Sequence, residues 1–325
     1  MKAWQRNGIV TTALLVFGAA RLPFEAGLAK ELRASGLTKT ALAAGTRERI
    51  GQTSAAVALG GLRTLVATFL NLKAFAYFEE RRWNDLEETY DTIVDLAPGT
   101  PYYWYAGSSH LAYDAASYYI NDSKLPALRR REAWRESIER GRAFLERGIQ
   151  NNPDDWNLLS QLGYLLADPN KVPAFRDRAR AYADSADAYR RAADTGKAPA
   201  MARRAQLYSL ARVPGRGNEA LALARSLYED SRNHLPTLTT LLLVLESHEN
   251  PALDTGKRAV ELFSTPQAAY ETLSNHWRMT RKGFPVHGVA AALETLEKQL
   301  GIPAEKSVFK QPLQPPADPT AWFSE

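Results

Sequence analysis

Two stretches decide the fold, Trp104-Tyr-Ala-Gly-Ser-Ser-His-Leu111 and Leu158-Leu-Ser-Gln-Leu-Gly-Tyr-Leu-Leu166. Each places large apolar or aromatic residues around a glycine, a pattern that lets a partner helix approach closely at the small residue. Pro98 and Pro153 lie a few residues before them, where each ends a preceding helix. The two stretches therefore predict helical hairpins, which build scaffolds more often than active sites.

The sequence on both sides has the same helical character. No stretch shows the sustained apolar–polar alternation that is typical of a β-strand. Helices are expected at 54–82, 83–96, 101–120, 125–150, 156–167, 175–194, 199–211, 218–233, 236–247, 252–263, 266–281 and 285–300. Short turns rich in Pro, Gly and Asn separate them, so the predicted fold is all-α, built from stacked antiparallel helical hairpins.

Composition and charge exclude several function classes. The 325 residues include no cysteine, which rules out disulfides, thiolate metal sites and cysteine nucleophiles. Residues 1–50 contain 8 Lys or Arg and 3 Asp or Glu, whereas residues 51–325 contain 33 of each kind. Because the net charge of +5 lies wholly in the first fifty residues, the body exerts no overall attraction on phosphates, and we expect no nucleic-acid partner.

The N-terminal residues 1–28 form a hydrophobic segment, expected to be helical. Gly8–Ala20 is apolar apart from two threonines, and Lys2 and Arg6 precede it. As a helix it is about 20 Å long, less than the roughly 30 Å hydrocarbon core of a bilayer. It is therefore an uncleaved anchor over residues 8–28, a cleaved signal peptide or a soluble helix. We favour the anchor, and the preceding positive charges place the body across the membrane from the cytoplasm.

The rest of the chain divides into a spacer at 29–58, a helical body at 59–300 and a Pro-rich tail at 301–325. A second membrane span over 55–72 is disfavoured because Arg63 lies in its middle. This first helix is instead expected to be a buried helix of the body, with contact to the membrane surface as a further option. The tail is expected to be extended, and Trp322 and Phe323 either dock it in a groove or belong to a disordered end.

The body resembles the tetratricopeptide repeat (TPR) superfamily, whose unit is a helical hairpin of about 34 residues. The resemblance spans roughly residues 60–265 and rests on four sets of positions. They are Tyr77, Leu86, Tyr90, Ile93 and Pro98; Trp104, Gly107, Ser108, Leu111, Gly141, Leu145, Gly148 and Pro153; Leu159, Leu162, Gly163, Leu166, Ser185, Tyr189 and Ala192; and Ala224, Tyr228 and Pro236. Pro98 and Pro153 are 55 positions apart, so the hairpin between them is enlarged.

This resemblance implies a right-handed solenoid with a concave inner surface. The residues that would line that surface are Asn71, Phe75, Tyr102, Tyr105, Ser109, Asn157, Ser160 and Tyr164. They lack the Lys/Arg/Asn set with which such repeats clamp a terminal carboxylate, so an aromatic, weakly polar peptide or helix is the expected ligand. The layout, with Gly60-Gly-Leu-Arg63 leading into the array, also resembles membrane-anchored repeat proteins of bacteria.

A search for catalytic and cofactor motifs gives no candidate. No two of the five histidines have metal-ligand spacing, and residues 215–220 fit a dinucleotide fingerprint only formally, since a helix precedes them. Ser108 and Ser109 are interpreted as small residues at a helix contact. Seven arginines between 176 and 204 could contact anionic lipid, but a solvated face is favoured.

The sequence therefore predicts a non-catalytic, membrane-anchored scaffold or adaptor that needs no cofactor or metal. Its partners would be integral membrane subunits of a bacterial envelope complex. The body would lie on the periplasmic side of the inner membrane. A soluble periplasmic binding module, released by signal-peptide cleavage, is the alternative, and an enzyme with a site that no motif describes is the third option.

Overall fold

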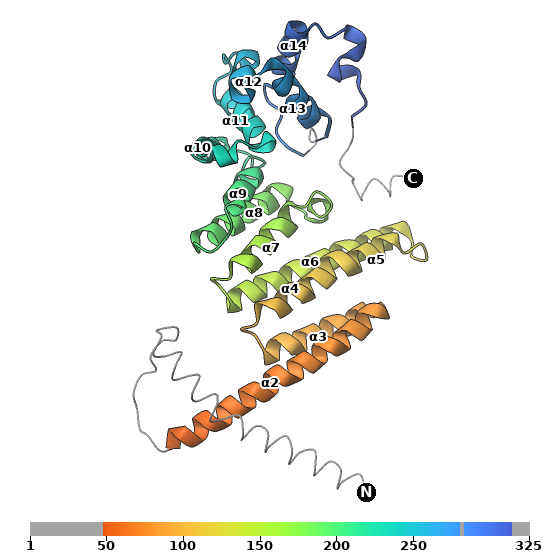
Figure 1. The fold of residues 1–325 in the computed structure, drawn as a ribbon. Helices are drawn as coiled ribbons and strands as arrows, with labels where there is room; N and C mark the ends of the chain where they lie inside the picture. The colour runs from red at the N-terminus through yellow and green to blue at the C-terminus, as the bar shows by residue number, and fades with distance from the viewer. Residues whose placement is uncertain (1–47, 280–282, 314–325) are drawn as a thin grey trace.

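Figure 1 shows the protein as a computed structural model, which describes residues 48–279 and 283–313. This part of the chain is helical and contains no strand, so the prediction of an all-α fold is confirmed. The predicted anchor at residues 8–28 lies outside the described residues, as do Trp322 and Phe323.

The helices follow the predicted ranges closely. Those of the first half are α2 (Glu48–Glu79), α3 (Trp83–Leu96), α4 (Pro101–Ser109), the π-helix η1 (His110–Ala115), α5 (Ala116–Asn121), α6 (Ala127–Asn151), α7 (Trp156–Ala167) and α8 (Arg178–Asp194). Those of the second half are α9 (Met201–Leu210), α10 (Gly217–Tyr228), α11 (Pro236–Glu249), α12 (Thr255–Phe263), α13 (Pro266–Met279) and α14 (Val289–Leu300). Single 3-10 turns lie at Val172–Ala174, Ser231–Asn233, Ala304–Lys306 and Val308–Lys310.

Local chemistry explains several helix starts. Pro101 and Pro236 occupy the first position of α4 and α11, where a missing N–H costs no helical hydrogen bond. Asp155 caps α7, because its carboxylate accepts a hydrogen bond from the backbone N–H of Leu158 at 2.8 Å. Asp177 and Asp254 cap α8 and α12 in the same way.

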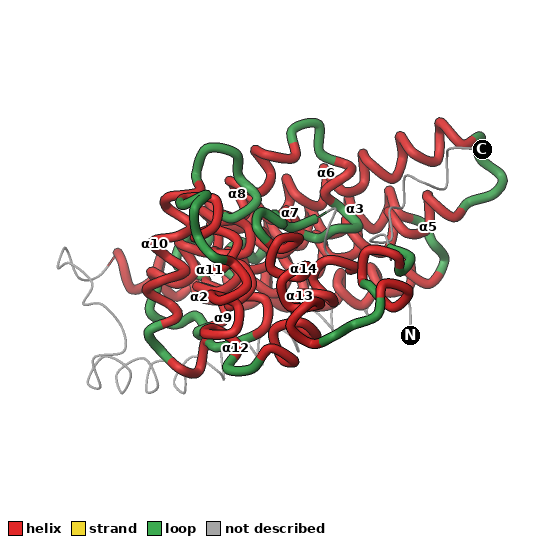
Figure 2. Tube along the Cα trace, turned by 90° about the horizontal axis from the view of Figure 1, so that it is seen from above, coloured by secondary structure: helices red, strands yellow, loops and turns green. Residues whose placement is uncertain are grey.

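The helices stack along one direction, and neighbours in sequence are neighbours in space (Figures 1 and 2). Helix α2 packs on α3, α4 and α5 pack on α6, and α7 packs on α8. Two hydrophobic cores fill the stack. The first joins α2 to α8 around Leu86, Ile93, Trp134 and Leu158, and the second joins α9 to α14.

Glycines set the distance between paired helices. A Cβ added to Gly163 would lie 2.8 Å from two ring carbons of Tyr189, and one added to Gly107 would lie 2.6 Å from the ring of Phe144. Real Cβ atoms do not approach so closely, so α7 and α8, and likewise α4 and α6, can pack in this way only because these residues are glycines. The close approach that the two deciding stretches predict is confirmed.

Two features differ from the sequence expectation. Helix α2 is not buried within the body, because six large apolar residues along it are exposed. The beginning of the tail is packed, since Val308 is buried and its N–H donates to the Glu297 carboxylate of α14 at 2.8 Å. Among the described residues no helix is long and apolar enough to cross a membrane.

Candidate functional site

The eight residues predicted to line a concave surface come from three helices, α2, α4 and α7. Within each helix they are spaced by three, four or seven positions, so they share one side of it. Asn71 and Phe75 lie on α2, Tyr102, Tyr105 and Ser109 on α4, and Asn157, Ser160 and Tyr164 on α7. We call these eight residues the aromatic face.

The aromatic face is open to solvent. Tyr102 is 58% exposed and Tyr164 is 54% exposed, and Phe75, Tyr105 and Asn157 are exposed as well. Asn71, Ser109 and Ser160 are half-buried. By contrast Tyr103 and Trp104, their neighbours in sequence, are buried in the first core. The dense aromatic run at 102–105 is therefore split, with two rings in the core and two available to a ligand.

Specific contacts join α2 to α3 and to η1 beneath this face. The hydroxyl of Tyr90 donates to the Asn71 side chain at 3.1 Å. The ring of Phe75 stacks on Phe78, and the ring of Phe78 lies 4.9 Å from that of His110. Helix α2 is thus joined to α3 through Tyr90 and to η1 through His110.

Tyr113 is a residue of this region that sequence reasoning did not select. Its ring stacks on that of Tyr164 with centroids 6.4 Å apart. Its hydroxyl oxygen is buried and has no hydrogen-bond partner within the described ranges. Burial raises the pKa of Tyr113, and the negative charge of Asp168 raises it further. A buried phenol in this state is a donor that a ligand could satisfy.

Lys171 is the second residue that the sequence did not reveal. Its side chain is buried, and its ammonium lies 5.0 Å from the centroid of the Tyr113 ring. Burial lowers the pKa of Lys171, whereas the carboxylates of Asp168 and Asp114 raise it. The amine of Lys171 therefore lies largely desolvated beside the ring of Tyr113, which stacks on Tyr164.

The π-helix η1 positions Tyr113 for these contacts. The N–H of Ala116 donates to the carbonyl of Leu111, five residues back, as a π-helix requires. Such one-turn insertions within α-helices are frequent at functional sites. Here the segment carries Tyr113 together with His110 and Asp114, whose side chains lie 2.8 Å apart.

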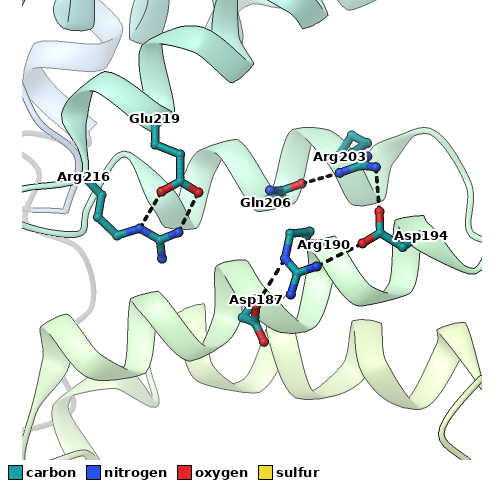
Figure 3. A network of polar contacts seen from close by, with 7 residues as sticks. All are labelled: Asp187, Arg190, Asp194, Arg203, Gln206, Arg216 and Glu219. Carbon is teal, nitrogen blue, oxygen red and sulfur yellow. Dashed lines mark hydrogen bonds and ion pairs between the residues drawn. The ribbon is translucent and has the colours of Figure 1, made fainter.

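Three of the seven arginines between residues 176 and 204, Arg180, Arg190 and Arg203, form ion pairs with aspartates of the same stretch. Figure 3 shows Arg190 between Asp187 and Asp194, and Arg203 reaching Asp194 and Gln206. Beyond this stretch, Arg216, which directly precedes α10, donates two short hydrogen bonds to Glu219 of that helix. These ion pairs favour the solvated face over an anion-binding surface in this region.

The remaining motifs have structural explanations. Ser108 is buried and its hydroxyl donates to the Gly141 carbonyl at 2.7 Å, so it serves a helix contact as expected. The Gly215 stretch comes after a helix and a turn rather than a strand. The rings of His248 and His287 lie 5.3 Å apart, a proximity that their sequence spacing does not predict. Within the described ranges no three His, Asp or Glu residues cluster as a metal site would.

These contacts determine the chemistry that the site can offer a ligand. Exposed tyrosines supply flat apolar area and hydroxyls at low cost in side-chain entropy, and a buried phenol and ammonium add two donors beside them. The arrangement suits a peptide or helix with aromatic or aliphatic side chains and one acceptor group. No protein-family model matches the chain, and no curated protein matches it.

Proposed function

We propose that the protein is a non-catalytic scaffold whose aromatic face binds a segment of a partner protein at a bacterial inner membrane. In this proposal the stacked hairpins form a TPR-like right-handed solenoid, and the aromatic face is its concave side. Residues 8–28 tether the chain as a single-pass anchor, with the body on the periplasmic side. The partners are integral membrane subunits of an envelope complex.

The observation that carries this proposal is the exposure of Tyr102, Tyr105 and Tyr164 on α4 and α7, two helices in contact with each other. Tyrosine is favoured at the energetic centre of interfaces, where truncating one such residue costs about 2 kcal/mol or more. Two such residues would account for about a thousandfold in affinity, since each 1.4 kcal/mol is a factor of about ten. No comparable row of tyrosines lies elsewhere among the described exposed residues.

The tether is supported by the sequence rather than by the described residues. Gly8–Ala20 is an apolar run between Arg6 and Arg21, and the chain's excess of positive charge lies within its first fifty residues. Positive charge before an apolar run favours translocation of the residues on its C-terminal side.

The test is a pull-down of the full chain from its native membranes in mild detergent. The wild type is expected to co-purify stoichiometric integral membrane subunits. The double variant Tyr102→Ser/Tyr164→Ser is expected to lose them. The matched control is Leu128→Ser, because Leu128 is 68% exposed on α6 and lies outside the aromatic face. Equal recovery from all three proteins would exclude the aromatic face as the binding site.

The soluble periplasmic module is the alternative, and it would use the same face for a soluble peptide. Intact-mass measurement of the protein from its native host separates the two. An intact N-terminus and retention in the membrane pellet after carbonate washing support the tether. Loss of about twenty residues together with release into the supernatant would replace the tether by the soluble module.

A further inference from the structure

Helix α2 carries an apolar stripe that the rest of the described chain does not cover. Its members are Leu62, Leu65, Phe69, Leu72 and Ala76, spaced by three and four residues along one side of the helix. Phe69 is 65% exposed and Leu72 is 64% exposed. Ala67 and Ala74, on the opposite side, are buried against α3. We call this stripe the outer face of α2.

The outer face is unusual for the end of a helical stack. In repeat arrays the terminal helix normally presents a polar outer side, because no neighbour covers it. Figure 1 shows α2 as the first layer of the described stack, with α3 against one side only. A contiguous apolar surface of this kind marks a site of interaction with a protein or a membrane.

The charge of α2 distinguishes among its possible occupants. From residue 50 to residue 78 the only charged residues are Arg63 and Lys73, and there is no acid. Lys73 borders the stripe, because it lies four residues after Phe69 and three before Ala76, and its ammonium lies 5.3 Å from the ring centroid of Tyr77. Arg63 lies four residues before the buried Ala67, on the opposite side of the helix. Pairing two copies of α2 through the stripe would leave Lys73 of each copy beside an apolar contact, with no acid between residues 50 and 78 to neutralise it. An anionic lipid surface complements both the stripe and the charge of Lys73 beside it.

The N-terminal segment makes such a surface reachable. The 19 residues from 29 to 47 connect the proposed anchor at 8–28 to α2. A chain of that length spans at most about 60–70 Å. The outer face begins 14 residues into α2, which is about 21 Å along the helix. The anchor and the outer face can therefore meet the same membrane.

We propose that the outer face of α2 lies in the headgroup region of the anionic membrane that holds the anchor. Leu62, Phe69 and Leu72 enter the acyl boundary, while the long side chain of Lys73 reaches the lipid phosphates. This inference rests on the tether of the proposed function and adds a second contact. Because α2 is the first layer of the stack, the other helices then extend away from the bilayer. The aromatic face, which begins on α2, lies next to the membrane surface.

The experiment uses the full chain, which contains no native cysteine. Single cysteines are introduced as Phe69→Cys, Leu72→Cys, Val16→Cys and Leu128→Cys, and each is labelled with an environment-sensitive fluorophore. Leu128 is the matched control for exposure, and Val16 reports on the tether. The labelled proteins are reconstituted into phosphatidylethanolamine–phosphatidylglycerol vesicles that contain a lipid with a nitroxide near the headgroup.

We expect the labels at positions 16, 69 and 72 to lose most of their emission and the label at position 128 to retain it. Quenching at 16 alone would overturn the contact of α2 and leave the tether standing. No quenching at any position would overturn both. A blue-shifted but unquenched label at 69 would mean that a protein covers the outer face, either a second copy or another segment of the chain, and would overturn the proposal.

Two further measurements complete the test. The first avoids the loss of an apolar residue, and the second tests the role of charge. Thr68→Cys labels a polar, exposed position beside the stripe and is expected to be quenched as well. Vesicles of phosphatidylcholine alone are expected to give weaker quenching at 69 and 72. Equal quenching in neutral and anionic vesicles would overturn the role given to Lys73.

Discussion

Gly141→Ala is the most demanding test of the packing between α4 and α6. A Cβ at position 141 would lie 2.7 Å from the Cβ of Ala112, 2.8 Å from its backbone N and 2.9 Å from the carbonyl oxygen of Ser108. Two of these atoms belong to the backbone, so no side chain can rotate away. The two helices must separate, which also strains the hydrogen bond from the Ser108 hydroxyl to the Gly141 carbonyl.

The expected size of this effect combines three contributions. Overpacking a core costs about 1–3 kcal/mol, and a hydrogen bond contributes about 1 kcal/mol. Replacing a helical glycine by alanine returns about 1 kcal/mol. With backbone atoms in the way, we expect the free energy of unfolding to fall by about 2–3 kcal/mol. At about 2–4 °C per kcal/mol, the melting temperature falls by about 4–12 °C.

The assay is thermal and urea unfolding followed by circular dichroism, with Gly61→Ala as the control. Gly61 is also helical, but a Cβ there meets nothing within 4 Å. The same chemical change should therefore stabilise the protein, by about 0.5–1 kcal/mol. A Gly141→Ala protein that is as stable as the wild type, or shifts in the same direction as Gly61→Ala, would refute the packing argument.

Three further predictions test single interactions. Asp155→Ala removes the α7 cap and should cost about 1 kcal/mol in urea unfolding, whereas the exposed Asp154→Ala should change stability by less than about 0.5 kcal/mol; equal effects would argue against the cap. Ser185→Ala removes a buried hydroxyl that bonds a carbonyl of α7 and should cost about 1–3 kcal/mol, while Ser160→Ala, whose hydroxyl returns to its own helix, should cost little. Burial lowers the pKa of His276 below 6.5, so its contribution to stability is complete above that pH and is lost as pH falls toward the folded pKa. His276→Gln should therefore weaken the loss of stability between about pH 7.5 and pH 5, and an unchanged pH dependence would contradict this.

The sequence predicts the end of a helix well where local chemistry marks it. Helix α3 ends at the predicted residue because Pro98 follows it, and helix α7 begins at the predicted residue because Asp155 caps it. The small-residue contacts at Gly107 and Gly163 were also predictable, since large side chains surround each glycine on the helix. These signals depend on neighbouring residues in the sequence, and the tertiary packing does not change the helix ends and helix contacts that they predict.

The parts of the candidate site that depend on packing could not be predicted. The π-helical register of His110–Ala115 arises inside a continuous helical pattern, and no turn residue marks it. Lys171 and Tyr113 are 58 positions apart and meet only because the turn after α7 folds back toward η1. The exposure of the outer face of α2 was also not predicted. An apolar stripe indicates that a helix side is buried, but it does not identify the surface that covers it.

Site-specific photocrosslinking tests the central claim most directly. A photoreactive phenylalanine analogue replaces Tyr164 in the full chain, and the same analogue replaces Leu128 in a control. Both proteins are irradiated in native membranes. The account predicts a discrete crosslink from position 164 to an integral membrane subunit, and none from position 128. Crosslinks that are equal at both positions, or absent at 164 while the subunits still co-purify, would contradict it.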